Sequence, residues 1–217
     1  MFNAIVFDLD GTLLDTMQDL ANAANYVCRQ NGWPQYTVDQ YKYFVGNGIP
    51  KLVERFSPAE ARTPERLAHT LDQFSRRYAA HKADVTAPYP GIPEALEQLR
   101  QAGVVLGVLS NKEDTLARAI VEQYFGSGLF AHVQGALPGL PVKPDPTTLR
   151  ALLARPEFAG RRVLFVGDSD VDILTARNAG LPGCGVLWGF RTRQELESAG
   201  AAYIIQQPHQ LVELAAR

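Results

Sequence analysis

Three short apolar runs, each ending in a polar residue, constrain the fold of this chain more than any other feature. They are continuously apolar and rich in β-branched residues, which is typical of strands covered on both faces in a parallel sheet. The runs cover residues 4–7, 104–109 and 163–166. The sequence therefore predicts buried parallel strands at these three places.

Helical patterns lie between the predicted strands, and turn residues mark where they begin and end. They cover residues 92–102, the stretch from Asp114 toward Tyr124, a stretch that starts at Asp145-Pro146, and residues 172–179. Two weaker strands are expected at residues 185–188 and 202–205, with a short helix after Pro208. This alternation of strand and helix predicts an α/β fold with a doubly wound (Rossmann-like) parallel sheet.

The stretch from residue 16 to residue 87 does not follow this alternation. It contains helical patterns without a convincing strand, interrupted at Gly32-Trp33-Pro34, at Gly46-Asn47-Gly48 and at Ser57-Pro58. A structureless connection of this length is improbable inside a compact domain. We therefore expect residues 16–87 to form a small α-helical cap domain, inserted into an α/β core of residues 1–15 and 88–217.

Charge and hydropathy exclude several classes of function. The 217 residues carry 21 Lys and Arg against 23 Asp and Glu, so the basic excess of a nucleic-acid-binding protein is missing. The first apolar run is interrupted by Asp8 after four residues, which is too short for a signal peptide, and no run is long enough to span a membrane. Cys28 and Cys184 lack a metal-ligand spacing and are expected to be buried thiols. We expect a cytoplasmic protein that binds neither nucleic acid nor membrane.

The polar residues that end the three strong strands are expected to lie close together. Ligands of open α/β sheets bind beyond the carboxyl ends of the strands. These ends carry Asp8, Ser110 and Asp168, and Asp10 follows Asp8 by two residues, which places it on the same side of an extended backbone. One loop therefore offers two carboxylates to the expected site.

A second acidic group follows the third strand in the sequence Gly-Asp-Ser-Asp-Val-Asp, residues 167–172. Some of these carboxylates are explained as partners of a helix N-terminus, but three exceed what capping requires. Together with the first loop they give five acidic groups near one point, which repel one another unless a cation lies among them. Because all the ligands are oxygen atoms, the pattern favours Mg²⁺ over zinc.

Taken singly, each feature has a simpler structural explanation as a turn, a capped helix or a solvated lysine. Their joint order is more specific. The motifs Asp-Leu-Asp-Gly-Thr from residue 8, Ser-Asn-Lys from residue 110, Lys-Pro-Asp-Pro from residue 143 and Gly-Asp-Ser-Asp-Val-Asp from residue 167 resemble the four motifs of the haloacid dehalogenase-like superfamily of phosphatases.

The resemblance implies a role for each matching residue. Asp8 is the nucleophile that forms an aspartyl-phosphate, Asp10 is the acid/base, and Lys143 neutralises phosphate oxygens and steadies Asp8. The phosphate is bound by Thr12, Ser110, Asn111 and Lys143. The Mg²⁺ ligands are Asp8, the backbone carbonyl of Asp10, Asp168 and Asp172.

The inserted segment resembles the cap of one branch of this superfamily. Residues 43–48 and 52–55 are similar to the cap loop and helix of bacterial phosphoglycolate phosphatases, and residues 186–190 are similar to a stretch after their fifth strand. Gly48 precedes a helix whose backbone N–H groups and dipole could receive a substrate carboxylate. The alternative is that the glycines only permit a tight turn between helices. Residues 135–141 depart from the relatives, which often carry acidic residues there.

The expected function is Mg²⁺-dependent hydrolysis of a phosphomonoester through an aspartyl-phosphate, with 2-phosphoglycolate as the substrate and glycolate and phosphate as the products. The alternatives are another small-molecule phosphatase, acting on a sugar phosphate, pyrophosphate or a nucleotide, and a phosphomutase on the same fold. A phospho-receiver switch uses similar residues, but Lys143 precedes the last acidic cluster here, which is the wrong chain order for a receiver. The expected partner is a small phosphorylated metabolite, and the sequence leaves monomer and homodimer open.

Overall fold

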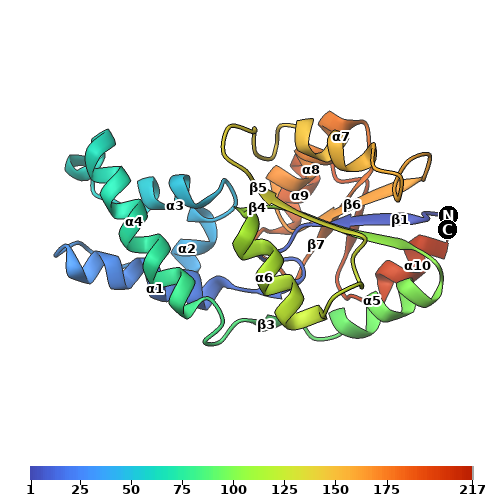
Figure 1. The fold of residues 1–217 in the computed structure, drawn as a ribbon, viewed down its shortest axis with the longest axis horizontal. Coiled ribbons are helices and arrows are strands. Elements are labelled where there is room, and N and C mark those ends of the chain that lie inside the picture. Colours follow the sequence, from blue (N-terminus) through green and yellow to red (C-terminus); the bar gives the residue numbers. More distant parts are fainter. Residues whose placement is uncertain (217) are drawn as a thin grey trace. The chain divides into compact units, whose positions relative to one another are not determined.

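A parallel six-stranded sheet forms the centre of the larger of two units in the structure, a computed structural model that describes residues 1–216 (Figure 1). This α/β unit consists of Met1–Leu14 and the chain from Pro88 onward, and the other unit is Asp15–Ala87. The strand order is β5-β4-β1-β6-β7-β8, and each neighbouring pair is parallel. The strands are β1 (Ala4–Phe7), β4 (Val105–Glu113), β5 (His132–Ala136), β6 (Val163–Gly167), β7 (Gly183–Val186) and β8 (Tyr203–Ile205).

This strand order confirms the predicted doubly wound sheet. The chain begins in the middle with β1, adds β4 and β5 on one side, and then returns to add β6, β7 and β8 on the other. The order therefore reverses between β1 and β6, and the reversal point of such a sheet is where ligands bind. Asp8 and Asp168 directly follow these two strands, at their carboxyl ends.

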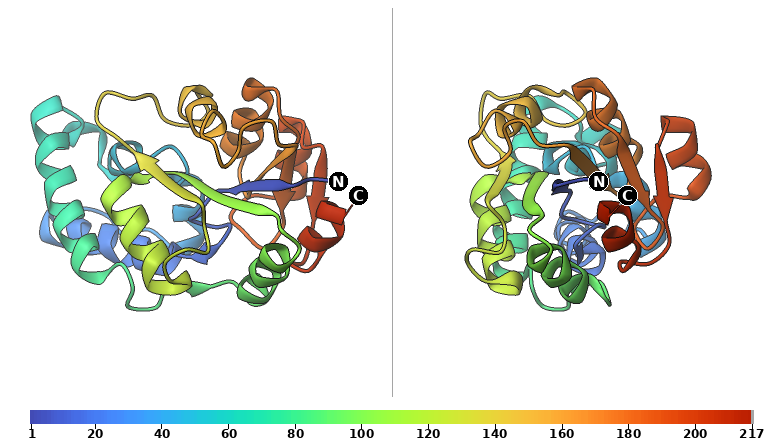
Figure 2. Two further views of the ribbon diagram at one scale, coloured as in Figure 1. Left: turned by 45° about the vertical axis from the view of Figure 1, so that its right-hand side comes forward. Right: turned by 90° about the vertical axis from the view of Figure 1, so that its right-hand side faces the viewer.

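Both faces of the sheet are covered, which explains why the strands are apolar throughout. In β1, the side chains of Ile5 and Phe7 are buried against one group of helices, and those of Ala4 and Val6 against another. The first group is α5 (Ile92–Gln101), α6 (Asp114–Phe125) and α10 (Gln210–Ala216); the second is α7 (Thr147–Leu153) and α8 (Asp170–Ala179), with α9 (Arg193–Ala199) packed on α8. Figure 2 shows the two layers from further directions.

The unit Asp15–Ala87 is helical. It comprises α1 (Met17–Gln30), α2 (Val38–Phe44), α3 (Ile49–Phe56), a short 3-10 turn (Ala59–Ala61) and α4 (Pro64–His81). Its core is aromatic: Phe74 of α4 stacks on Tyr78 and meets Phe56 of α3, and all three rings are buried. The side chain of Asn25 joins α1 to the next segment, because it bonds both backbone groups of Tyr36.

Two short strands carry the chain into and out of the helical unit. They are β2 (Leu14–Asp15) and β3 (Ala87–Pro88), and they pair with each other. Just inside β3, the buried carboxylate of Asp19 accepts hydrogen bonds from the backbone N–H groups of Val85 and Thr86 and from the Thr86 hydroxyl. The start of α1 and the exit of the unit are therefore fixed to each other.

Some elements differ from the sequence predictions. Strand β5 is absent from the predictions, and β4 continues through Ser110, Asn111 and Lys112 instead of ending at residue 109. β7 begins at residue 183 instead of 185, and α8 begins at residue 170 instead of 172. β5 was missed because it lies at the edge of the sheet and carries polar residues and a glycine, so it lacks the apolar pattern of a central strand.

Both cysteines are free and buried in the structure, as the sequence predicts. Among residues 1–216, each helix is too short or too polar to cross a lipid bilayer.

Candidate active site

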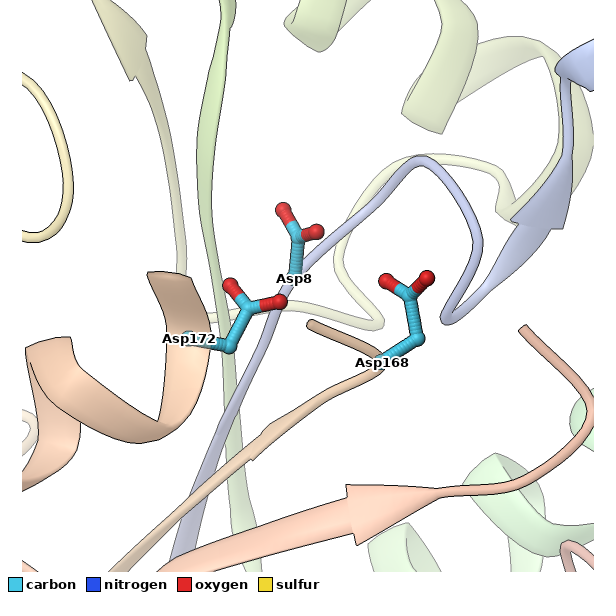
Figure 3. Close-up of side chains that lie close together, drawn as sticks. All are labelled: Asp8, Asp168 and Asp172. Carbon is cyan, nitrogen blue, oxygen red and sulfur yellow. The ribbon is translucent and has the colours of Figure 1, made fainter. Parts of the chain in front are cut away.

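Three aspartates meet at the carboxyl ends of β1 and β6, where the strand order reverses (Figure 3). Asp8 follows β1, Asp168 follows β6, and Asp172 lies in the first turn of α8. One carboxylate oxygen of each residue lies within 4.8 Å of those of the other two, and all three residues are buried. The sheet topology thus brings together carboxylates that are up to 164 positions apart in the chain, from residue 8 to residue 172.

Lys143 is the cation of this cluster. Its Nζ lies 2.7 Å from Asp8 Oδ1 and 2.6 Å from Asp172 Oδ1, and its side chain is only 3% exposed. A buried ammonium group is costly unless it is paired, so the two carboxylates and the lysine stabilise one another. One lysine leaves the three carboxylates with an excess of negative charge.

The side chain of Asn111 fixes the backbone of Lys143. Its Nδ2 donates to the Lys143 carbonyl oxygen at 3.0 Å, and its Oδ1 accepts from the Lys143 N–H at 2.9 Å. The sequence resemblance assigned Asn111 to phosphate through its backbone, and that role stays a prediction. The structure adds a function for its side chain, which orients the loop that carries Lys143.

Asp172 is held by the turn that precedes it. Its Oδ2 accepts from the backbone N–H of Ser169 at 3.1 Å and from the Ser169 hydroxyl at 2.6 Å, forming a capping box at the start of α8. Its Oδ1 accepts from Lys143. Both oxygens of Asp172 therefore have protein donors. Asp170, which is not among the predicted metal ligands, has a half-exposed side chain, and its Oδ1 lies 3.9 Å from Nε of Arg191.

Asp168 is held by donors from two loops. The Thr12 hydroxyl donates to its Oδ1 at 3.2 Å, and the backbone N–H of Phe190 donates to its Oδ2 at 2.8 Å. Two glycines allow this approach: a Cβ atom on Gly11 or on Gly189 would overlap the Asp168 side chain. Gly11 also has a φ of +91°, which favours glycine.

Burial and mutual repulsion raise the pKa values of two of the carboxyls. Burial, and then the charge of Asp172, raises the pKa of Asp8 from 3.8 to about 7, although Lys143 acts in the opposite direction. Burial and the charges of Asp172 and Asp8 hold the pKa of Asp168 well above its usual range. Burial alone would lower the pKa of Lys143, but Asp172 and Asp8 raise it above its usual value.

These properties fit a divalent cation. The ligand atoms are carboxylate oxygens that converge within one small volume, and their charges are only partly compensated by Lys143. Without a cation, burial and mutual repulsion shift Asp8 and Asp168 toward the protonated form, as their raised pKa values indicate. Asp8, Asp168 and Asp172 can therefore hold a metal ion.

Asp10 takes part in a second ion pair. Its two carboxylate oxygens lie 2.8 Å and 3.0 Å from Nζ of Lys112, whose side chain is 2% exposed. Lys112 is the last residue of the Ser-Asn-Lys motif, and the resemblance assigns it no role. The available signal was its position two residues after Ser110 on an extended strand, which puts both side chains on the same side of β4.

The remaining predicted phosphate ligands occupy different environments. Ser110 is buried at the end of β4, and its Oγ accepts from the backbone N–H of Lys112. Thr12 is fully buried, and its hydroxyl donates a hydrogen bond to Asp168. Binding of phosphate by Thr12 stays a prediction. Gly48 belongs to the helical unit, where it precedes α3 with a φ of +84°.

Known proteins are similar to this chain along almost its entire length. The family model described as haloacid dehalogenase-like hydrolase matches residues 5–186. Phosphoglycolate phosphatases of Caulobacter vibrioides and Vibrio cholerae are 39% identical over 203 residues and 33% identical over 218 residues. These alignments cover 93% and 97% of this chain, and 85% and 95% of the relatives. A crystal structure of a provisionally assigned phosphoglycolate phosphatase from Lactobacillus delbrueckii subsp. bulgaricus superposes with a TM-score of 0.91 at 33% identity, covering 99% of this chain and 98% of the other.

Proposed function

We propose that this chain, which belongs to the haloacid dehalogenase-like hydrolase family and is a phosphatase, hydrolyses 2-phosphoglycolate to glycolate and phosphate with Mg²⁺ and through an aspartyl-phosphate on Asp8. The observation that carries the proposal is the contact of 2.7 Å between Lys143 Nζ and Asp8 Oδ1, inside a cluster with Asp168 and Asp172. In this contact Asp8 is a buried carboxylate that can act as the nucleophile, and Lys143 is a cation that can neutralise an incoming phosphate.

The first chemical step is the transfer of the phosphoryl group to Asp8. A carboxylate oxygen of Asp8 forms a bond to phosphorus while the bond from phosphorus to the glycolate oxygen breaks. Asp10, two residues further along the same loop, gives its proton to the leaving oxygen. Lys143 stabilises the charge on the phosphoryl oxygens, with Asn111 holding the loop on which Lys143 lies.

The second step releases phosphate. Water attacks phosphorus, Asp10 accepts a proton from it, and the bond between phosphorus and Asp8 breaks, which restores both carboxyl groups. The two steps share one acid/base residue and one binding site for the transferred group. Splitting one difficult hydrolysis in this way lowers the barrier of each part.

Mg²⁺ is proposed as the resident cation of Asp8, Asp168 and Asp172, with the backbone carbonyl of Asp10. At about 4 Å and an effective dielectric constant near 20, one pair of like charges costs about 4 kcal/mol. A phosphate dianion beside these carboxylates therefore needs more positive charge than Lys143 provides. When bound, the cation supplies that charge and helps to orient the phosphoryl group.

The choice of 2-phosphoglycolate rests on the named relatives and on the loop before α3. We propose that the helical unit acts as a cap that admits small phosphorylated metabolites, and that the backbone at Gly48 binds the substrate carboxylate. The side chain of Arg55 braces this loop, because it donates to Asn47 Oδ1 at 2.9 Å and to the Phe44 carbonyl oxygen at 2.8 Å. The same contacts fit a loop that serves only as a turn. A cytoplasmic location is part of the proposal.

A panel of phosphomonoesters tests the reaction and the substrate separately. Purified protein with Mg²⁺ is assayed on 2-phosphoglycolate, sugar phosphates, nucleotides, pyrophosphate and p-nitrophenyl phosphate. We expect the highest kcat/KM on 2-phosphoglycolate. A preference for a sugar phosphate or pyrophosphate rejects the substrate but keeps the phosphatase, and isomerisation of a sugar phosphate without phosphate release indicates a mutase.

Gly48→Val tests the carboxylate site. The variant should raise KM for 2-phosphoglycolate more than for p-nitrophenyl phosphate, which lacks a carboxylate. Gly32→Val serves as a control, because Gly32 also has a positive φ, of 68°, and lies in the helical unit, with no atom within 4 Å of the place that a Cβ atom would take. Equal effects of Gly48→Val on both substrates would support the turn interpretation.

A further inference from the structure

The ion pair between Lys112 and Asp10 involves a buried lysine, and the proposed mechanism gives Lys112 no role. Lys112 Nζ lies 2.8 Å from Asp10 Oδ1 and 3.0 Å from Oδ2, so one ammonium group engages both oxygens of the carboxylate. The two residues are 102 positions apart: Asp10 lies in the loop after β1, and Lys112 lies near the end of β4, the parallel neighbour of β1. The contact is therefore a product of the sheet and not of local sequence.

The environment of Lys112 distinguishes this pair from the surface ion pairs of the molecule. Its side chain is 2% exposed, whereas the side chain of Lys51, which pairs with Glu54 on α3, is 45% exposed. Placing an ammonium group in a buried position costs free energy that an apolar residue would not incur. The burial of Lys112 therefore indicates a function beyond that of a surface ion pair.

The position of Asp10 shows what can be gained. Its side chain is 15% exposed, both of its oxygens contact Lys112, and it follows Asp8 by two residues. A general acid/base works only when its oxygen is held within hydrogen-bond reach of the reacting group. An aspartate in a loop between β1 and β2 has two rotatable side-chain bonds, and a contact with both oxygens restricts them.

We propose that Lys112 is a positioning residue that holds the Asp10 carboxylate in place for proton transfer. The proposal rests on the acid/base role of Asp10 in the proposed function. Lys112 acts through Asp10 and leaves the nucleophile, the phosphate ligands and the metal ligands to the residues already described. We therefore expect Lys112 to increase the rate for substrates whose leaving group needs a proton. For substrates whose leaving group needs no proton, its effect should be small.

Leaving groups of different basicity test this expectation. An alkyl phosphate needs a proton on its leaving oxygen, whereas p-nitrophenolate leaves without one. We expect Lys112→Met to lower kcat/KM on an alkyl phosphate by about tenfold or more, and on p-nitrophenyl phosphate by about threefold or less. In an Asp10→Asn background, Lys112→Met should cause no further loss on either substrate. An equal loss on both substrates, additive losses in the double variant, or unchanged or raised activity on the alkyl phosphate overturns the proposal.

Two further measurements separate this proposal from folding and from the proposed function. Arg118→Met is the matched control, because it removes the cation of another aspartate pair, with Asp114 at 2.7 Å, in the same unit; it should leave the ratio of the two substrates unchanged. The alkyl substrate is whichever member of the panel the wild type hydrolyses, so a wrong substrate assignment does not affect the test. A crystal structure of Lys112→Met should show the Asp10 carboxylate displaced or in several rotamers, and an unmoved carboxylate contradicts the proposal even if no phosphatase activity is found.

Discussion

The side-chain amide of Asn111 bonds both backbone groups of Lys143, donating to its carbonyl oxygen at 3.0 Å and accepting from its N–H at 2.9 Å. The two residues come from different segments, the end of β4 and the loop before α7. An amide is suited to this contact because it carries one donor and one acceptor group side by side. Asn111 thereby positions the backbone of Lys143, the residue that supplies the cation of the acidic cluster.

Replacing Asn111 by leucine should therefore affect catalysis through Lys143. Both hydrogen bonds are lost, and we expect kcat to fall by about tenfold to a hundredfold while the free energy of unfolding falls by about 1–3 kcal/mol. Steady-state kinetics and urea denaturation measure the two effects. Asn178→Leu is a suitable control, because Asn178 makes a hydrogen bond of similar length, 3.0 Å, to the neighbouring Pro144 carbonyl oxygen on the exposed side. A variant Asn111→Leu with wild-type kcat would contradict this function of the amide.

Asp8→Asn should abolish turnover without unfolding the protein. The amide preserves the shape of the side chain but cannot attack phosphorus, and it also removes one of three mutually repelling carboxylates. We expect less than a few per cent of wild-type activity, because the nucleophile is lost, and a melting temperature equal to or above that of the wild type without metal. Asp170→Asn, at the half-exposed first residue of α8, should retain activity. Substantial turnover by folded, metal-loaded Asp8→Asn would falsify the assignment of the nucleophile.

The metal-free protein should lose stability as the pH rises toward neutrality. Burial and then the charge of Asp172 raise the pKa of Asp8 from 3.8 to about 7 in the folded state, and the pKa of Asp168 is raised as well. The folded state thus binds these protons more tightly than the unfolded state does. The contribution of Asp8 to stability is complete below about pH 4 and is lost as the pH rises through about 7, and the contribution of Asp168 has the same sign.

A divalent cation should reverse this trend, because it binds the ionised carboxyls. Thermal unfolding with a chelator and with Mg²⁺, at pH 5 and pH 8, measures both effects. We expect the increase in Tm caused by Mg²⁺ to be larger at pH 8 than at pH 5. Asp168→Asn should reduce the difference between the two pH values. An increase in Tm that is the same at both pH values would show that the cation binds elsewhere.

Gly11→Ala should weaken the metal site specifically. A Cβ atom at this position overlaps the carboxylate of Asp168, and the φ of +91° adds backbone strain. Gly103→Ala is the matched control, since Gly103 has a φ of +76° but no atom within 4 Å of the place that a Cβ atom would take. Both variants should lose about 1 kcal/mol or more of stability from the backbone conformation. Only Gly11→Ala should also raise the Mg²⁺ concentration needed for half-maximal activity, and an equal requirement in the two variants would count against the close packing on Asp168.

The sequence was sufficient to predict the doubly wound sheet and the meeting of its acidic residues, because both follow from local patterns. Continuous apolar runs identify buried parallel strands, and the rule that ligands bind at their carboxyl ends brings Asp8 and Asp168 together without any knowledge of side-chain contacts. The doubly wound order was inferred from the alternation of strands and helices, and it places the two residues on adjacent strands.

The contacts that orient these residues were beyond sequence reasoning. The partner of Asp10 is 102 positions away, and the partner of the Asn111 amide is 32 positions away. The local sequence places Lys112 on the same side of β4 as Ser110, but it does not identify Asp10 as the partner, because that contact depends on how β4 and the loop after β1 pack. The donor to Asp168 from Phe190 is a backbone N–H, which any residue except proline provides, so it has no sequence signature.

The pairing of β2 with β3 has a consequence for how this chain can change over time. Residues 14–15 and 87–88 lie side by side, and the Tyr89 N–H donates to the Leu13 carbonyl oxygen at 3.2 Å. The chain therefore leaves the α/β unit and returns to it at neighbouring positions. The insertion therefore leaves the spacing of the surrounding backbone unchanged, whatever its length, and the entropy of closing a loop grows only slowly with that length. We therefore expect that a different helical segment can replace this one at the junction without moving β1 or the carboxylates beyond it. With the cap role proposed above, such an exchange would change the substrates and leave the hydrolytic centre unaltered.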